Sequence, residues 1–155
     1  MAIEIERKFL LNSSDWKLGA SGTLFRQGYL NRDPARTVRV RIAGEAAFLT
    51  IKGKTSGATR SEFEYPIPLA EAADLLALCD GPLIEKTRYC VTVAGFVWEI
   101  DEFAGDNAGL VVAEIELPSE DTVFTRPDWL GDEVTGDARY YNSSLSKTPY
   151  SAWGR

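Results

Sequence analysis

The sequence near the amino terminus reads Ile3-Glu4-Ile5-Glu6-Arg7-Lys8-Phe9-Leu10, in which apolar and charged side chains largely alternate. In an extended strand, successive side chains point to opposite faces, so Glu4, Glu6 and Lys8 share one face at intervals of about 7 Å. Carboxylates suit a hard cation such as magnesium, and a lysine suits a phosphate. A half-exposed antiparallel strand shows the same alternation, and it is the commoner origin of a single E-x-E-x-K pattern. The interpretation therefore depends on whether the rest of the chain repeats it.

The alternation recurs along most of the chain. Seven further segments read as strands separated by turns or loops: residues 24–30, 37–42, 47–54, 60–67, 83–93, 96–103 and 110–118. Most of these strands carry two or more charged side chains on one face: Glu4, Glu6, Lys8, Arg39, Arg41, Lys52, Lys54, Glu62, Glu64, Lys86, Arg88, Glu99, Asp101, Glu114 and Glu116. An ordinary solvated face would mix in more Thr, Ser and Gln. The sequence therefore predicts a mainly β fold with about eight strands and one almost wholly ionic sheet face.

The opposite face of these strands is apolar and aromatic, and includes Phe48, Phe63, Tyr65, Tyr89 and Trp98. A helix predicted over Leu69–Cys79, ended by Asp80-Gly81-Pro82, needs such an apolar surface to pack on. If the sheet curls into a barrel, we therefore expect the charged face to lie inside; the alternative is a solvated charged face on the outside. Each uncompensated buried ion costs several kcal/mol, so a charged interior needs water and a ligand that balances its charges.

The hairpin of residues 37–42 and 47–54 concentrates positive charge on one face, through Arg39, Arg41, Lys52 and Lys54. Like charges at this spacing repel one another, and an anionic ligand would remove the repulsion. One arginine can bind two phosphate oxygens at once. Carboxylates hold magnesium ions, which bridge phosphates. A ligand with several phosphates would therefore use both the positive and the negative side chains. The sequence has neither G-x-x-x-x-G-K-[ST] nor G-x-G-x-x-G, so the usual nucleotide-binding loops are not expected.

Length and composition narrow the function classes. The 155 residues are expected to form one domain over residues 1–155, and the net charge of −6 argues against a general nucleic-acid-binding protein. No apolar run approaches the ~18 residues of a membrane-spanning helix. The sequence has no histidine, which excludes Ser-His-Asp and Cys-His catalysis and histidine-bound zinc within this chain. The chain begins with a strand and without a basic-then-apolar segment, so we expect the cytoplasm as its compartment.

The carboxy-terminal third is less regular. Residues Ser119–Gly136 show no clear helix or strand period. A helix is predicted over Asp137–Ser146 with Asp137 as its N-cap, and Thr148–Arg155 reads as a tail.

The ordered set of these patterns resembles a known family, the CYTH superfamily of triphosphate tunnel metalloenzymes. Glu4-Ile5-Glu6-Arg7-Lys8 looks like its E-x-E-x-K signature, and the similarity spans roughly residues 3–145. It continues in order through the segments 26–30, 38–41, 49–52, 62–65, 84–89, 99–103, 113–117 and 137–142. The forms Glu4-Ile5-Glu6-Arg7-Lys8-Phe9-Leu10 and Glu85-Lys86-Thr87-Arg88-Tyr89 are most similar to those of the bacterial inorganic tripolyphosphatases.

The resemblance implies an eight-stranded antiparallel β-barrel with a few covering helices, whose tunnel binds a triphosphate and a divalent metal ion. It implies that magnesium, with manganese as the alternative, is bound by Glu4, Glu6, Glu114 and Glu116, with Glu64 and Asp101 as further contributors. It implies that phosphates are bound by Lys8, Arg39, Arg41, Lys52, Lys86 and Arg88, with Lys54 in a more variable loop. Arg139 would contact substrate from a carboxy-terminal segment that approaches or closes one tunnel mouth, where Tyr141 and Ser143 replace lysines of some members.

The function expected from this resemblance is metal-dependent hydrolysis of inorganic tripolyphosphate to diphosphate and phosphate, an acid anhydride hydrolase activity. Lys86, Lys52 and Glu4 would be catalytic, because the lysines would stabilise charge on the transferring phosphoryl group and the carboxylates would help to position water. Other enzymes of the same scaffold, a class IV-type adenylyl cyclase or a thiamine or nucleoside triphosphatase, stay open. So does a non-catalytic polyphosphate-binding module.

The expected partner is a small-molecule triphosphate, with no nucleic acid and no membrane. The sequence leaves open the physiological substrate, the number of metal ions and the oligomeric state, a homodimer included.

Overall fold

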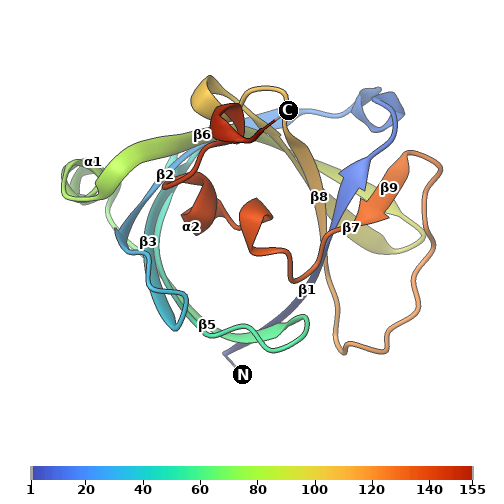
Figure 1. Cartoon of the computed structure of the whole chain (residues 1–155), viewed down its shortest axis with the longest axis horizontal. Helices are drawn as coiled ribbons and strands as arrows, with labels where there is room; N and C mark the ends of the chain where they lie inside the picture. The colour runs from blue at the N-terminus through green and yellow to red at the C-terminus, as the bar shows by residue number, and fades with distance from the viewer. Residues whose placement is uncertain (1, 155) are drawn as a thin grey trace.

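The computed structural model describes residues 2–154, and its main feature is a nine-stranded antiparallel sheet that closes on itself (Figure 1). The sheet order is β5-β4-β3-β2-β6-β7-β8-β1-β9, and β5 also pairs with β1. Closure between β5 and β1 makes β1 to β8 an eight-stranded barrel, as the sequence predicted, while β9 lies outside along β1. The bounds are β1 Ile3–Leu11, β2 Gly22–Asn31, β3 Arg36–Ala43, β4 Ala46–Gly53, β5 Thr59–Pro66, β6 Asp80–Val93, β7 Phe96–Phe103, β8 Val111–Glu116 and β9 Leu130–Glu133.

The strand register keeps the charged side chains on one face, and that face lines the cavity inside the barrel. Residues directly opposite each other on neighbouring strands share a face, and Arg39 pairs with Thr50, which in turn pairs with Glu64. In the same way, Lys8 of β1 lies opposite Glu114 of β8. The predicted alternation is therefore correct, and its charged side points inward.

The helix α1, Leu69–Ala77, packs on the outside of β3 and β4. Its Ala72 and Leu76 are buried against Val40 and Ala47. The helix ends two residues before the predicted Cys79, and Asp80-Gly81-Pro82 opens β6 instead of forming a turn. Gly81 has a φ of +71°, which a side chain would disfavour, and it lies where the pairing of β6 with β2 shifts register.

A second outer cluster lies on β1, β7 and β8 beneath the segment 118–129. Trp98 is fully buried and makes edge-on contacts with the rings of Phe9, Phe124 and Trp129. The stretch Ser119–Gly136 was expected to be irregular, and the four-residue strand β9 within it was missed. Trp16, in the short 3₁₀ turn Asp15–Lys17, closes the same cluster from the other side.

Three aromatic residues differ from the prediction of a uniformly covered apolar face. Phe63 and Tyr65 of β5 lie on the outer face but are 44% and 53% exposed, because α1 packs mainly on β3, β4 and β2. Phe48 is on the inner face, since it lies opposite Arg41 in the register. Its assignment to the outer face was wrong, because residues 48, 50 and 52 of one strand must share a side.

The carboxy-terminal segment enters the ring of strands, where it lies inside the barrel in the view of Figure 1. The predicted helix over Asp137–Ser146 is not continuous: a 3₁₀ turn, Ala138–Tyr140, and a short helix α2, Asn142–Leu145, are separated by an extended Tyr141 (ψ 135°). Asp137 does accept a hydrogen bond from the amide of Arg139, as an N-cap would.

Apolar contacts close this end of the barrel. Tyr140 and Leu145 are buried against Ile84, Phe103 and Val112 from the strands. The predicted tail contains a 3₁₀ turn, Tyr150–Ala152, and Arg155 lies outside the described residues. A further 3₁₀ turn spans Gly105–Asn107. Within residues 2–154, neither α1 nor α2 is long and apolar enough to cross a membrane.

Candidate active site

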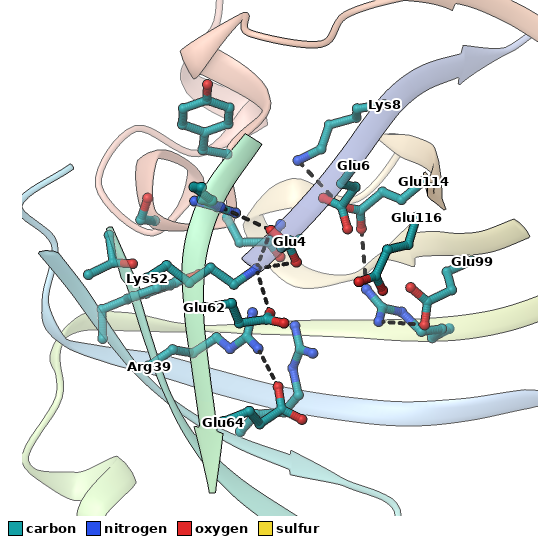
Figure 2. A pocket seen from close by; sticks show the side chains of 18 of the residues that line it. Glu4, Glu6, Lys8, Arg39, Lys52, Glu62, Glu64, Glu99, Glu114 and Glu116 are labelled. Atoms are coloured by element: carbon teal, nitrogen blue, oxygen red, sulfur yellow. Dashed lines mark hydrogen bonds and ion pairs between the residues drawn. The ribbon is translucent and has the colours of Figure 1, made fainter. Parts of the chain in front are cut away.

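A cavity of about 230 Å³ runs through the barrel interior and is lined almost entirely by charged side chains (Figure 2). It contains thirteen of the fifteen charged residues singled out in the sequence, all except Lys54 and Asp101. Seven cationic side chains line it: Lys8, Arg39, Arg41, Lys52, Arg60, Lys86 and Arg88. Seven carboxylates line it as well: Glu4, Glu6, Glu62, Glu64, Glu99, Glu114 and Glu116. The formal charges of the tunnel wall therefore cancel.

The Glu4 carboxylate joins two cations from strands β4 and β5. Lys52 Nζ donates to it at 3.0 and 3.2 Å, and Arg60 Nε donates at 3.0 Å. Burial alone would raise the pKa of Glu4, but Lys52 and Arg60 outweigh that effect and lower it to about 2. Glu4 is therefore ionised at neutral pH and holds the Lys52 ammonium in the tunnel (Figure 2).

This contact predicts a pH dependence of folding stability. A carboxylate whose pKa falls from 4.5 to about 2 on folding stabilises the protein above pH 4.5, and the gain disappears as the pH falls towards 2. In chelator, Glu4→Gln should lower the free energy of unfolding by up to about 3 kcal/mol at pH 7. The difference from wild type should shrink between pH 5 and 2 in urea titrations. A difference that stays constant over this range would contradict the assignment.

Glu6 and Glu114 place two carboxylates side by side at the centre of the tunnel (Figure 2). Burial raises the pKa of Glu6 well above its ordinary value, and the neighbouring charges of Glu114 and Glu4 raise it further. Burial also opposes the charge of Glu114, but Lys8, whose Nζ lies 3.8 Å away, and Arg88 hold its pKa well below the ordinary value. The opposite shifts mean that the pair favours sharing one proton over carrying two negative charges, and a divalent metal ion could take the place of that proton.

Lys86 and Arg88 of β6 both bind Asp101 of β7. Lys86 Nζ donates to Asp101 Oδ2 at 2.7 Å, and Arg88 makes a bidentate contact with the same carboxylate at 2.8 and 2.9 Å. Asp101 lies behind these two cations and does not line the cavity. Burial lowers the pKa of Lys86 to about 7, although the charge of Asp101 acts in the opposite direction. The ammonium is therefore held in a dry position at the tunnel wall, where Phe25 and Phe103 surround it.

Arg39 and Arg41 of β3 enter the cavity beside this group. Arg39 donates through one Nη to Thr50 at 3.2 Å, but its buried Nε has no hydrogen-bond partner among the described residues. Arg41 Nε donates to Gln27 at 2.8 Å, and burial, together with Arg39 and Arg88, lowers the pKa of Arg41 to about 9. An unsatisfied buried donor and crowded guanidinium groups are features of a site that receives an anion.

Two residues expected to bind substrate lie outside the cavity. Lys54 is exposed and lines a separate hollow of about 590 Å³ beside the tunnel, together with Arg32 and Lys147. Arg139 is exposed, makes an ion pair with Asp137 at 2.8 Å, and lies over the ring of Trp153. Neither is among the described residues that line the tunnel cavity.

The structure also adds tunnel residues beyond the charged set singled out in the sequence. Arg60 precedes Glu62 and Glu64 at the same two-residue spacing, so alternation could have placed it on the inner face. Tyr29 and Thr37 lie on predicted strands and gave no chemical signal. The tunnel residues Tyr141, Asn142 and Ser143 all come from the carboxy-terminal segment. No periodic pattern could have assigned them to the interior, because the segment is not a regular helix.

Comparison with known proteins gives the same family as the fold and the site. A family model described as the CYTH domain matches residues 2–151. The chain is 52% identical over 151 residues to an inorganic triphosphatase of Acetivibrio thermocellus, covering 97% of each protein. It is 38% identical over 149 residues to an inorganic triphosphatase of Nitrosomonas europaea, covering 92% of this chain and 96% of that protein. A crystal structure of an inorganic triphosphatase is similar with a TM-score of 0.67 at 36% identity, covering 94% of this chain and 95% of that chain. Sequence, fold and tunnel thus agree, and the chain belongs to the CYTH domain family.

Proposed function

We propose that this protein is a metal-dependent tripolyphosphatase, which hydrolyses inorganic tripolyphosphate to diphosphate and phosphate in the barrel tunnel. The observation that carries the proposal is the tunnel wall itself, in which seven cations and seven carboxylates face a single cavity. The relatives named inorganic triphosphatase support this choice of substrate. The proposal places the activity in the cytoplasm, with small triphosphates as partners.

The cationic part of the wall is suited to bind the phosphate groups. We assign this role to the tunnel cations predicted from the sequence: Lys8, Arg39, Arg41, Lys52, Lys86 and Arg88. The buried Nε of Arg39 has no acceptor among residues 2–154, so a phosphoryl oxygen would satisfy it if the side chain moved on binding. Lys54, outside the tunnel, would act earlier by attracting the anion to the mouth. The substrate contact expected of Arg139 stays a prediction.

The carboxylate part of the wall fits a divalent cation. Because the wall is neutral overall, a bound triphosphate would leave an excess of negative charge that a divalent metal ion offsets. Glu4, Glu6, Glu114 and Glu116, with Glu64, provide the oxygen ligands that magnesium and manganese accept. Within residues 2–154 no three acidic side chains converge into a ready metal cage. Magnesium commonly uses one or two carboxylates together with substrate phosphates, so we expect metal and substrate to bind jointly.

Asp101 differs from the other proposed metal ligands, since it does not line the cavity and its carboxylate is bound by Lys86 and Arg88. We therefore propose that it orients these two cations. A bound metal ion would supply charge neutralisation and help to activate water. Lys86 and Lys52 would then stabilise negative charge on the transferring phosphoryl group, and ionised Glu4 would hold Lys52 and accept a hydrogen bond from the attacking water.

The proposal is tested by phosphate release with magnesium, comparing tripolyphosphate, ATP and thiamine triphosphate in parallel. We expect tripolyphosphate to be the best substrate, with release abolished by chelator and restored by magnesium or manganese. Formation of diphosphate and a cyclic nucleotide from ATP would replace the proposal by a cyclase. Tight triphosphate binding without turnover of any of the three would replace it by a polyphosphate-binding module.

A further inference from the structure

The Lys86 ammonium is held between two acceptors from distant parts of the chain. It donates to Asp101 Oδ2 of β7 at 2.7 Å and to Asn142 Oδ1 of α2 at 2.9 Å. Lys86 is fully buried, and an ammonium carries three N–H donors. These two acceptors leave one donor of Lys86 for a ligand in the adjoining tunnel, which a small movement of the buried side chain would bring within reach.

Asn142 is joined in turn to a substrate-binding arginine through Gln27 of β2. Gln27 is fully buried, accepts from Arg41 Nε at 2.8 Å, and donates from Nε2 to Asn142 Oδ1 at 3.1 Å. The orientation of both amides follows from their neighbours, because lysine and arginine can only donate. The oxygen of Gln27 must face Arg41, and the oxygen of Asn142 must face Lys86. The amide nitrogen of Gln27 is then free to donate to the Asn142 oxygen, as observed.

The Asn142 side chain is not needed to form its own helix. The α2 helix begins without a side-chain cap, and Asn142 contributes to it only through its backbone oxygen, which accepts from Ser146. Docking of the segment inside the barrel is carried by the apolar side chains of Leu145 and Tyr140, which are 0% and 8% exposed. Removal of the Asn142 amide should therefore leave the segment in place.

We infer that Asn142 is a positioning residue for Lys86. The Lys86 ammonium is then correctly placed for catalysis only when the carboxy-terminal segment is docked in the barrel. The inference rests on the proposed function, which gives Lys86 its role at the phosphoryl group. Without the Asn142 oxygen, the flexible lysine is fixed by Asp101 alone and its ammonium can turn away from the tunnel. Misplacement of a catalytic group by about 1 Å can cost on the order of 10²-fold in rate.

The test compares Asn142→Leu and Asn142→Ala with wild type in steady-state hydrolysis of tripolyphosphate with magnesium. Both variants lack the acceptor, and we expect kcat to fall about 10- to 100-fold while KM changes less than about threefold. Asn142→Asp keeps an acceptor for Lys86 and Gln27 but adds a negative charge. It should recover most of kcat relative to Asn142→Leu while raising KM for the anionic substrate. Ser144→Ala, on the same helix, is the matched control and should behave as wild type.

The outcomes separate the inference from the proposed function. Wild-type turnover with an unchanged kcat in both Asn142→Leu and Asn142→Ala would overturn the inference and leave the function standing. Loss of kcat that Asn142→Asp fails to recover would also overturn it, since the oxygen would then not be the feature that matters. An inactive wild-type chain would overturn both. Thermal unfolding of each variant shows whether the barrel is folded. If leucine disrupts the barrel, the kcat of Asn142→Ala alone decides the test.

Discussion

Replacing Lys86 by methionine is expected to lower kcat for tripolyphosphate by about 10²- to 10³-fold while the barrel remains folded. Lys86 is a fully buried cation of the tunnel wall, with Asp101 and Asn142 as acceptors and two aromatic rings around it. Its charge would be aimed at the phosphoryl group before substrate arrives, and such preorganised charges have the largest effect in a water-poor site. Methionine keeps an unbranched apolar stem and ends one atom short of the ammonium, so it removes the donor and its charge.

The fold should survive this change for a specific reason. Asp101 keeps both hydrogen bonds from Arg88, so its buried charge is not left without a partner. The pKa of Lys86, lowered to about 7 by burial, also shows that burial opposes its charge more strongly than Asp101 favours it. Removing the ammonium therefore costs less than breaking a well-balanced buried ion pair.

The measurement is steady-state phosphate release, with urea unfolding of the same samples. Lys17→Met is the matched control, because Lys17 is exposed, pairs with the surface residue Glu102, lies over the ring of Tyr89 and does not line the tunnel. It should retain wild-type kcat. Wild-type kcat in Lys86→Met would remove Lys86 from the catalytic group and with it the explanation offered for Asn142.

The strands could be predicted from the sequence because a period of two leaves little freedom. In residues 37–42, Arg39 and Arg41 must share a face whatever surrounds them. The period does not say which face is inside, and here the charge segregation and the need of α1 for an apolar surface pointed the right way. The same reasoning predicted that Phe63 and Tyr65 would be covered, but both are exposed, because a single nine-residue helix covers only part of a barrel.

The elements that were missed depend on tertiary contacts. Strand β9 has four residues and exists only by pairing with β1, where Gly131 approaches so closely that a Cβ would lie 2.9 Å from the Leu10 carbonyl oxygen. No local sequence pattern predicts such a strand. Asn142 is one polar residue in an irregular segment, and its contact with Lys86 joins positions 56 residues apart in the sequence. Chemistry that depends on a single distant contact leaves no periodic signal.

Replacing Glu114 by glutamine should abolish most turnover and leave metal-free binding of tripolyphosphate intact. Glu114 lies between Glu6, Lys8 and Arg88, at the centre of the carboxylates that we propose as metal ligands. The amide keeps the shape of the side chain but removes a charge that a divalent cation needs. We expect kcat with magnesium to fall about 10²- to 10³-fold, because the metal supplies several kcal/mol of charge stabilisation.

The sign of the binding change distinguishes an enzyme from a polyphosphate-binding module. In chelator, loss of one carboxylate makes the tunnel wall more positive, so tripolyphosphate should bind as tightly as to wild type or more tightly in calorimetric titrations. Glu71→Gln, on the exposed surface of α1, is the control and should change neither quantity. Wild-type turnover in Glu114→Gln would show that this carboxylate is not needed for catalysis. Weaker metal-free binding in the variant would show that Glu114 serves mainly to orient Lys8 and Arg88, and its assignment as a metal ligand would then be wrong.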